Sequence, residues 1–246
     1  MRSGILLTWM LSTCVYAGSM GGESSPKNYL KFSSGGSFSY TSHIYADPIY
    51  WDASPQGYDG KLGHSALYGV AGGSHFNPLW SGDIEFIYRP SFNYKKYQTS
   101  TAYNTIFFNG EKNRYFNFES NSLMANLYLK GSGLTDRFND FGAEPFIGGG
   151  LGVAFNTIKD FHTQRFSDGS FRGILQDHLR SSLAFQFSAG LRLITHSNYE
   201  FDLGYRYYNA NTYSTSNFVI NTNDYATPWK GTFQSNEFFV HLGYKF

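Results

Sequence analysis

Eight stretches of this chain place a large apolar side chain at every second position, with small or polar residues between them. This period of two indicates β-strands that have one apolar face. The stretches cover residues 29–38, 64–73, 80–94, 115–130, 141–156, 181–195, 199–209 and 233–246. Most are 10 to 16 residues long, whereas a globular strand averages about 5–6 residues and a membrane-crossing strand needs about 9–11. The lengths therefore favour strands that cross a membrane.

The stretch at residues 115–130 is regular only in its second half. There, Leu123, Leu127 and Leu129 share one face, and Asn126 and Lys130 lie on the other. In the first half the apolar positions change phase, so we expect a β-bulge or a late start of the strand in that half.

The connections between the stretches alternate in length. Residues 39–63, 95–114, 157–180 and 210–232 form long, polar connections, whereas 74–79, 131–140 and 196–198 are short. This order is expected when one end of a barrel faces the cell exterior and the other faces a periplasm. An even number of strands returns the chain to the side on which it started, so we expect both termini in the periplasm.

The face opposite the large apolar side chains decides which side of the barrel meets lipid. A face exposed to water would be rich in Lys, Glu, Gln and Thr, but this one carries small residues with isolated charges between them. Its small residues are Gly148, Gly150, Gly152, Ser188, Gly190, Gly204 and Gly243. They fit the narrow interior of an eight-stranded barrel, and closure satisfies every backbone group in hydrocarbon. The sequence therefore predicts an all-β fold, an eight-stranded antiparallel up-and-down transmembrane β-barrel over residues 29–246, with the apolar face toward lipid.

Charged residues on the predicted inner face are nearly balanced in sign, with six acids and five bases. Burying a charge is costly unless it is paired, so we expect a network of salt bridges that plugs the lumen and sets the strand register. An ion path through rearranging pairs is the alternative, although eight strands leave little free bore. The predicted network consists of Asp83, Glu85, Arg89, Lys130, Glu144, Arg192, Glu200, Asp202, Arg206, Glu237 and Lys245.

The first 17 residues have the pattern of a cleaved secretory signal peptide. Arg2 gives a positive start, residues 5–15 are mostly apolar, and Ala17 supplies a small residue before the cut. Residues 18–28 follow as a flexible lead-in. Cys14 is the only cysteine and is a poor match to a lipoprotein acylation site. The rest of the chain therefore has no thiol for a disulfide or a thiolate metal site.

Four stretches carry more than the alternation: SLMANLY at 122–128, EPFIGGGLG at 144–152, FDLGYRY at 201–207 and FFVHLGYKF at 238–246. They resemble the small eight-stranded outer-membrane barrels of Gram-negative bacteria, the opacity-protein-like and OmpA-transmembrane-domain-like group. The resemblance implies a bacterial outer-membrane location, with contact to outer-membrane lipid and lipopolysaccharide. It also implies that the C-terminal aromatic strand is the signal read by the barrel-assembly machinery. The matching positions are Phe238, Val240, Leu242, Tyr244 and Phe246.

Enzymatic and metal chemistry find little support in the sequence. The seven histidines are scattered, without a metal-binding spacing such as H-x-x-x-H. A Ser–His–acid triad needs mutual hydrogen-bond reach, but His196 and Ser197 lie in a short connection, and His241 and Glu237 are about 13 Å apart along a strand. We therefore expect no enzyme, no metal and no cofactor, and a lipid A-modifying hydrolase is the least favoured alternative.

The long connections are the remaining candidates for molecular contact. Tyr50 and Trp51 in the first, and residues 213–227 in the fourth, mix aromatic with polar side chains, which suits contact with proteins or glycans. A net charge of +1 gives no bulk attraction to nucleic acid. The sequence therefore predicts a structural and surface-interaction protein that meets host or environmental molecules, with a small porin-like channel as the alternative.

Overall fold

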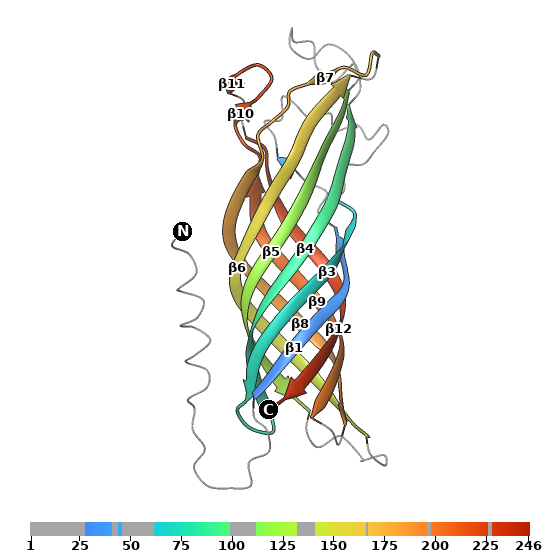
Figure 1. Ribbon diagram of the computed structural model, residues 1–246, viewed down its shortest axis with the longest axis vertical. Helices are drawn as coiled ribbons and strands as arrows, with labels where there is room; N and C mark the ends of the chain where they lie inside the picture. Colours follow the sequence, from blue (N-terminus) through green and yellow to red (C-terminus); the bar gives the residue numbers. More distant parts are fainter. Residues whose placement is uncertain are drawn as a thin grey trace.

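Eight long strands close into a ring in the computed structural model of this chain, which describes residues 28–40, 44–45, 62–98, 112–131, 141–165, 167–195, 198–225 and 228–246 (Figure 1). The long strands are β1 (Asn28–Ser39), β3 (His64–His75), β4 (Trp80–Gln98), β5 (Lys112–Lys130), β6 (Phe141–Arg165), β8 (His178–Thr195), β9 (Tyr199–Ser214) and β12 (Lys230–Lys245). Each pairs antiparallel with the next, and the pairing of β1 with β12 closes the ring. The predicted eight-stranded antiparallel barrel is confirmed. Within these ranges, no helix is long and apolar enough to cross a membrane.

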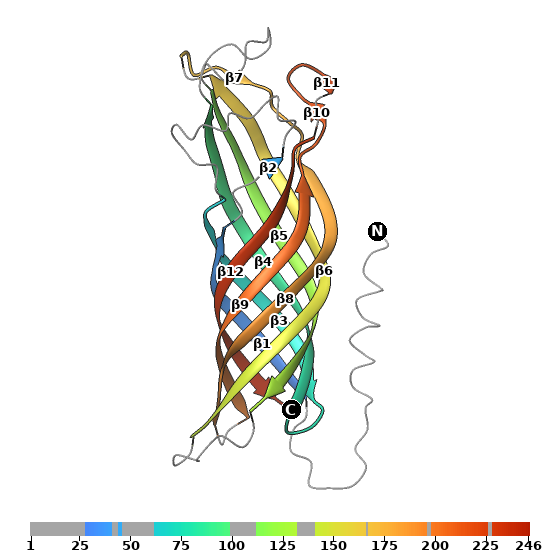
Figure 2. The ribbon, with the colours of Figure 1, turned by 180° about the vertical axis from the view of Figure 1, so that it is seen from behind.

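Four short strands lie in segments that were predicted as loops. β2 (Ile44–Tyr45) lies beside β12 and nearly continues the register of β1 (Figure 2). β7 (Phe171–Arg172) pairs with β6, and β10 (Phe218–Val219) pairs with β11 (Asp224–Tyr225). All four short strands lie toward the end of the barrel opposite the C-terminus (Figure 2). We call this the long-loop end, and the end that carries the C-terminus the short-turn end.

The long strands extend further toward the long-loop end than predicted. Residues 95–98, 112–114, 157–165, 178–180, 210–214 and 230–232 are strand, not loop. At about 3.3 Å per residue, the 25 residues of β6 measure roughly 80 Å along the strand. With a tilt of about 40°, they rise some 60 Å along the barrel axis, more than twice the roughly 25 Å apolar band of a membrane barrel. The wall therefore continues well past the membrane.

The start of the barrel differs slightly from the prediction. Asn28, expected in the flexible lead-in, begins β1 and is tied to the last residue, because Asn28 N donates to Phe246 O at 3.2 Å and Phe246 N donates to Asn28 O at 2.9 Å. The predicted signal peptide and the remainder of the lead-in lie outside the described residues.

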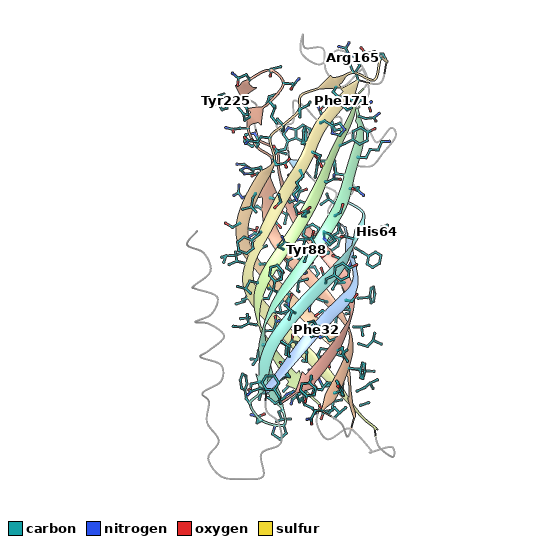
Figure 3. The ribbon with its side chains drawn as sticks, in the orientation of Figure 1. Phe32, His64, Tyr88, Arg165, Phe171 and Tyr225 are labelled. Carbon is teal, nitrogen blue, oxygen red and sulfur yellow. The ribbon has the colours of Figure 1, made fainter. Side chains whose placement is uncertain are left out.

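Large apolar side chains cover the outside of the barrel nearer the short-turn end. Phe32 and Tyr88 point outward from the wall (Figure 3), as do Leu127, Phe187 and Leu203. Aromatic residues mark both rims of this band, with Trp80, Tyr199 and Tyr244 at one rim and the paired Tyr68 and Tyr88 toward the other. A continuous exposed apolar surface of this kind is unstable in water but matches hydrocarbon between two aromatic girdles.

Beyond this apolar band the alternation keeps its phase, but the two faces exchange their chemistry. In β5, every even-numbered residue from 114 to 130 is buried. Within the band the buried face carries Asn126 and Lys130, whereas beyond it the buried face carries Phe116 and Phe118. The outside there turns polar because water replaces lipid, so the apolar side chains must turn inward.

The predicted change of phase in the first half of β5 is therefore wrong, since only the chemistry of the faces changes. The bulge or late start expected in this strand is also wrong, because β5 begins at Lys112. Its pairing with β6 does shift between Tyr115 and Asn117, but two steps of β5 there face three steps of β6, from Lys159 to His162, so the extra residue belongs to β6.

The two solvent environments can be tested on a single strand. Ile84 and Asn93 both face outward on β4, Ile84 inside the apolar band and Asn93 beyond it. We expect Ile84→Arg to destabilise the barrel by about 2–4 kcal/mol, because a charge would enter hydrocarbon, and Asn93→Arg to have little effect. Urea unfolding in lipid vesicles measures both. Equal stability of the two variants would contradict the placement of the band.

Candidate functional site: an interior closed by two different plugs

The interior beside the apolar band holds a network of buried ions, and its central pair is Arg89 with Glu237. Arg89 donates to Glu237 from Nε at 2.6 Å and from Nη2 at 3.1 Å, and its guanidinium lies 3.8 Å from the centre of the Tyr208 ring. Ser37 and Ser235 donate to the same carboxylate at 2.9 and 3.0 Å. The carboxylate is thus fully surrounded by donors, the condition under which a buried pair is tolerated.

Glu85 forms the next layer toward the short-turn end. Arg206 Nη2 donates to both of its oxygens, at 3.1 and 2.9 Å, and Asn126 and Ser33 donate at 3.2 Å each. Arg206 Nη1 also approaches Glu237 at 3.6 Å. Arg206 therefore links this layer to the central pair.

Asp202 anchors the layer below. Arg192 Nε donates to it at 2.8 Å, and Lys31 Nζ donates at 2.8 Å from β1, on the far side of β12. His241 Nδ1 lies 3.3 Å from Asp202, and its Nε2 lies 3.7 Å from Glu85. The imidazole thus bridges two layers of the network.

The short-turn mouth of the lumen ends in a chain of hydrogen bonds. Lys130 Nζ donates to His75 Nδ1 at 3.2 Å, and His75 Nε2 lies 3.1 Å from Glu200 Oε1. Lys245 Nζ is 3.6 Å from the same oxygen. An ammonium has only donors, so His75 Nδ1 accepts and His75 Nε2 carries the proton toward Glu200.

The structure places nine of the eleven predicted lumen charges in the buried interior. The other two, Glu144 and Lys245, are half-buried at the short-turn mouth. Sequence reasoning did not include Lys31, His75 or His241 in the network. With Lys31, the fully buried set contains five acids and five bases, so its formal charges cancel. The sequence does indicate the position of Lys31, because it lies between the apolar Leu30 and Phe32 and therefore on the opposite, inner face of the strand.

The interior beyond the apolar band is closed mainly by aromatic rings, with the guanidinium of Arg114 buried beside the Trp229 ring, 4.6 Å from its centre. Phe233 lies 4.9 Å from Phe92 and 4.8 Å from Phe118, centre to centre. Tyr94 stacks on Phe116 at 4.4 Å. The other members of this aromatic plug are Leu62, Met124, Ala154, Ile158, Phe161, Leu175, Ala184, Tyr208, Ala210 and Tyr213, with Val219 and Trp229 packed against them. The expected interior of glycine and paired ions therefore holds only for the half beside the apolar band.

Two glycines of the inner face have no room for a side chain. A Cβ on Gly148 would collide with the Tyr128 ring, and a Cβ on Gly152 would collide with the carbonyl oxygen of Leu123. Small residues at these positions let the neighbouring interior side chains fit, as predicted for a narrow barrel.

Two long connections are joined into a small sheet above the aromatic plug. Leu175 bridges to Val219, and Ile220 N donates to Ile174 O at 2.8 Å. Leu175 is buried against the plug, whereas the outer side chain of Ile220 is 53% exposed. Phe171 and Tyr225, 59% and 73% exposed, lie at the same end (Figure 3). We call Phe171, Ile220 and Tyr225 the apolar cap.

The remaining predicted sites are placed as follows. Tyr50 and Trp51 lie outside the described residues, as do His196 and Ser197. Tyr213, expected in the fourth loop, is instead fully buried at the end of β9. Among the described residues, no group of three His, Cys, Asp or Glu side chains is arranged to hold a metal ion. The C-terminal strand turns Phe238, Val240, Leu242, Tyr244 and Phe246 outward.

The coupling of Arg89 and Glu237 can be measured with a double-mutant cycle. Arg89→Met leaves Glu237 buried with fewer positive partners, so we expect a loss of about 3–5 kcal/mol in unfolding free energy. Combining it with Glu237→Gln removes the stranded charge, so the double variant is expected to lose less than the sum of the single variants. Urea unfolding in vesicles supplies all three values. Strict additivity would mean that the pair is not coupled.

Comparison with known proteins agrees with this architecture. A family described as "Outer membrane protein beta-barrel domain" matches residues 5–246. Neisserial surface protein A, from Neisseria, is 14% identical, with 89% of this chain and 97% of that chain covered and a TM-score of 0.49. OprG of Pseudomonas aeruginosa is 14% identical, with 90% of this chain and 96% of that chain covered and a TM-score of 0.47. The attachment invasion locus protein Ail of Yersinia pestis is 15% identical, with 87% of this chain and 99% of that chain covered and a TM-score of 0.33. No curated protein sequence matches significantly. The family match covers nearly the whole chain, which therefore belongs to the outer-membrane β-barrel family and is a bacterial outer-membrane protein.

Proposed function

We propose that this protein is a surface-contact protein, in which a closed barrel carries interaction loops away from the outer membrane. In this proposal the long-loop end faces the exterior, and the short-turn end with both termini faces the periplasm after removal of residues 1–17. The outward apolar band contacts outer-membrane lipid and lipopolysaccharide. The C-terminal strand ending at Phe246 serves as the signal for the barrel-assembly machinery.

The closed interior is the observation that carries this proposal. Side chains fill the lumen along both halves of the barrel, with ions mainly in one half and aromatic rings mainly in the other. The two plugs depend on different interactions, so the loss of one leaves the other in place. A channel would need both to move, which makes the porin-like alternative less favourable.

The length of the wall is the second support. β4, β5 and β6 continue beyond the apolar band as a water-exposed wall whose outer face carries residues such as Asn93, Asn117 and Lys159. Such an extension adds nothing to membrane anchoring. It does raise the apolar cap above the membrane surface, where it can reach a partner. Exposed aromatic and aliphatic residues on a rigid support are typical of interaction surfaces.

Enzymatic activity is not part of the proposal. His241, which lies against Asp202, is only 3% exposed, so a substrate has no access to it. Ser33 donates its hydroxyl to Glu85 and not to a histidine. Neither group therefore offers the accessible nucleophile and base that acyl transfer requires.

Single-channel recording on the purified protein in planar bilayers tests the closed interior. We expect no conductance steps from the wild type, and none from Glu237→Gln, because the aromatic plug still closes the barrel. Stable steps from the wild type would favour the channel alternative. Steps from Glu237→Gln alone would show that the ions are the only effective plug.

Binding assays on whole cells test the contact function. Cells that display the wild type should bind host cells or matrix-coated surfaces better than cells without it. We expect Ile220→Ser with Tyr225→Ser to lower that binding, because truncating exposed anchor residues typically costs over 1 kcal/mol. Asn93→Ser, on the outer wall below the cap, is the matched control. Unchanged binding by the cap variant at equal surface expression would count against the cap.

A further inference from the structure

Two joints of the described barrel wall are incomplete. The ladder between β3 and β4 ends at Tyr68 and Tyr88, although β3 extends to His64 and β4 to Gln98, and the joint between β8 and β9 lacks a ladder over a longer stretch. The backbone ladder between β8 and β9 ends at Phe185 and Asn209, although both strands continue. β8 remains paired with β6 as far as His178, and β9 remains paired with β12 as far as Ser214. Residues 178–184 and 210–214 therefore face each other without a backbone ladder in the part of the wall that the structure describes. We call this joint the β8–β9 seam.

A bulge bends β9 where the seam begins. The register of β9 against β12 shifts between Phe233 and Gln234, so Ala210 has no partner in that ladder. The next residue, Asn211, adopts a positive φ of 57°, and its backbone N donates to Asn209 Oδ1 at 2.7 Å. An inserted residue bends the strand that carries it, which explains why β9 departs from β8 at this point.

Side chains close the seam in place of backbone hydrogen bonds. Asn156, which is buried and comes from β6, donates from Nδ2 to the carbonyl oxygens of Ala210 at 3.2 Å and Thr212 at 3.4 Å. The hydroxyl of Ser182 also donates to Ala210 O. Further along, Arg180 Nη1 lies 3.5 Å from the Ser214 hydroxyl. These hydrogen bonds across the seam thus come from side chains, those of Ser182 and Arg180 on β8 and of Asn156 on the neighbouring β6.

The seam begins near the rim of the apolar band, and the outward Leu183 and Leu179 of β8, 76% and 58% exposed, continue the apolar outer face along it. The outward rings of Phe185 and Tyr207 lie 6.1 Å apart at the last paired rows, and the seam runs from there toward the long-loop end. On its inner side lie the hydroxyls and amides of Ser120, Asn156 and Ser182, which hydrogen-bond to one another. An opening at this position would connect this polar strip with the lipid headgroups beside the wall.

We propose that the β8–β9 seam opens locally while the rest of the barrel stays closed, and that it opens sideways toward the lipid headgroups. Local opening is favoured where few backbone hydrogen bonds must break. The other joint of β8, with β6, has a complete ladder over the same residues and stays closed. Asn156 and Ser182 act as the latch, because they are the side chains that satisfy the β9 carbonyls.

Cysteine labelling in lipid vesicles tests the proposal on the full-length protein with Cys14→Ser. Ser182→Cys places a thiol at the seam, and Ser188→Cys is the matched control, six residues along the same inner face of β8 but between two complete ladders. The probe is a maleimide carried on a phospholipid headgroup. We expect Ser182→Cys to react about tenfold faster than Ser188→Cys. Equal rates would overturn the proposal.

Removing the latch gives the second measurement. Asn156→Ala should speed the labelling of Ser182→Cys several-fold and leave Ser188→Cys unchanged, and heat-modifiable gel mobility verifies that each variant is folded. An unchanged rate in the folded Asn156→Ala variant would contradict the latch. If this variant fails to fold, the comparison of Ser182→Cys with Ser188→Cys decides alone.

The route of entry is tested with a second reagent, a soluble maleimide attached to a bulky polymer. This reagent can approach only from the aqueous side, so we expect it to label Ser182→Cys more slowly than the lipid-bound maleimide. Faster labelling by the polymer reagent would place the route through the loops and overturn the lateral opening.

Discussion

The solvent outside the barrel changes from hydrocarbon to water partway along its axis, and the interior changes with it. Where lipid surrounds the wall, apolar side chains gain nothing by turning inward, so the inside can hold Arg89, Glu237 and the other paired ions. Where water surrounds the wall, burial of apolar surface again stabilises the fold, and Phe92, Phe118 and Phe233 turn inward. One uninterrupted alternation in β5 serves both situations, because the period of two fixes which face a residue occupies and not what that face must contain.

The two plugs contribute differently to the fold. Buried ion pairs are weak sources of net stability, because desolvation offsets much of their attraction, but leaving one partner unpaired is costly. The five acids and five bases beside the apolar band therefore act mainly against wrong arrangements: a slip of β12 by one residue would move Glu237 to the lipid face and strand Arg89. The aromatic plug contributes burial without such selectivity. In a barrel that contains both plugs, the ion network fixes the strand register in one half, and the aromatic plug supplies much of the apolar burial in the other half.

Much of this arrangement is present in the sequence. The alternation locates all eight long strands, and the glycines of the inner face identify which face is inside. The ends of the strands are harder, since residues 157–165 of β6 carry polar residues outward and include Asp160 with a positive φ of 54°, both of which suggest a loop. Contacts inside the lumen are beyond sequence reasoning: Lys31 and Asp202 are 171 positions apart, and only closure of the ring brings their strands together. The sequence assigns His241 no acidic partner, because Glu237 is distant along the same strand, whereas in the barrel Glu85 of β4 and Asp202 of β9 lie beside the imidazole.

The incomplete joint between β8 and β9 follows from the same division of the barrel. A closed ladder of fixed strand number and register fixes the bore, and the half beside the apolar band keeps that bore small by placing Gly148 and Gly152 against larger neighbours. The other half must enclose rings such as Phe118, Tyr213 and Phe233 within the same wall. Ending one backbone ladder at Phe185 and Asn209, with Ala210 inserted in β9, releases that constraint where the rings begin. Asn156 and Ser182 then satisfy the carbonyls that the missing ladder leaves behind, so this incomplete joint of the wall lies where the surrounding lipid gives way to water.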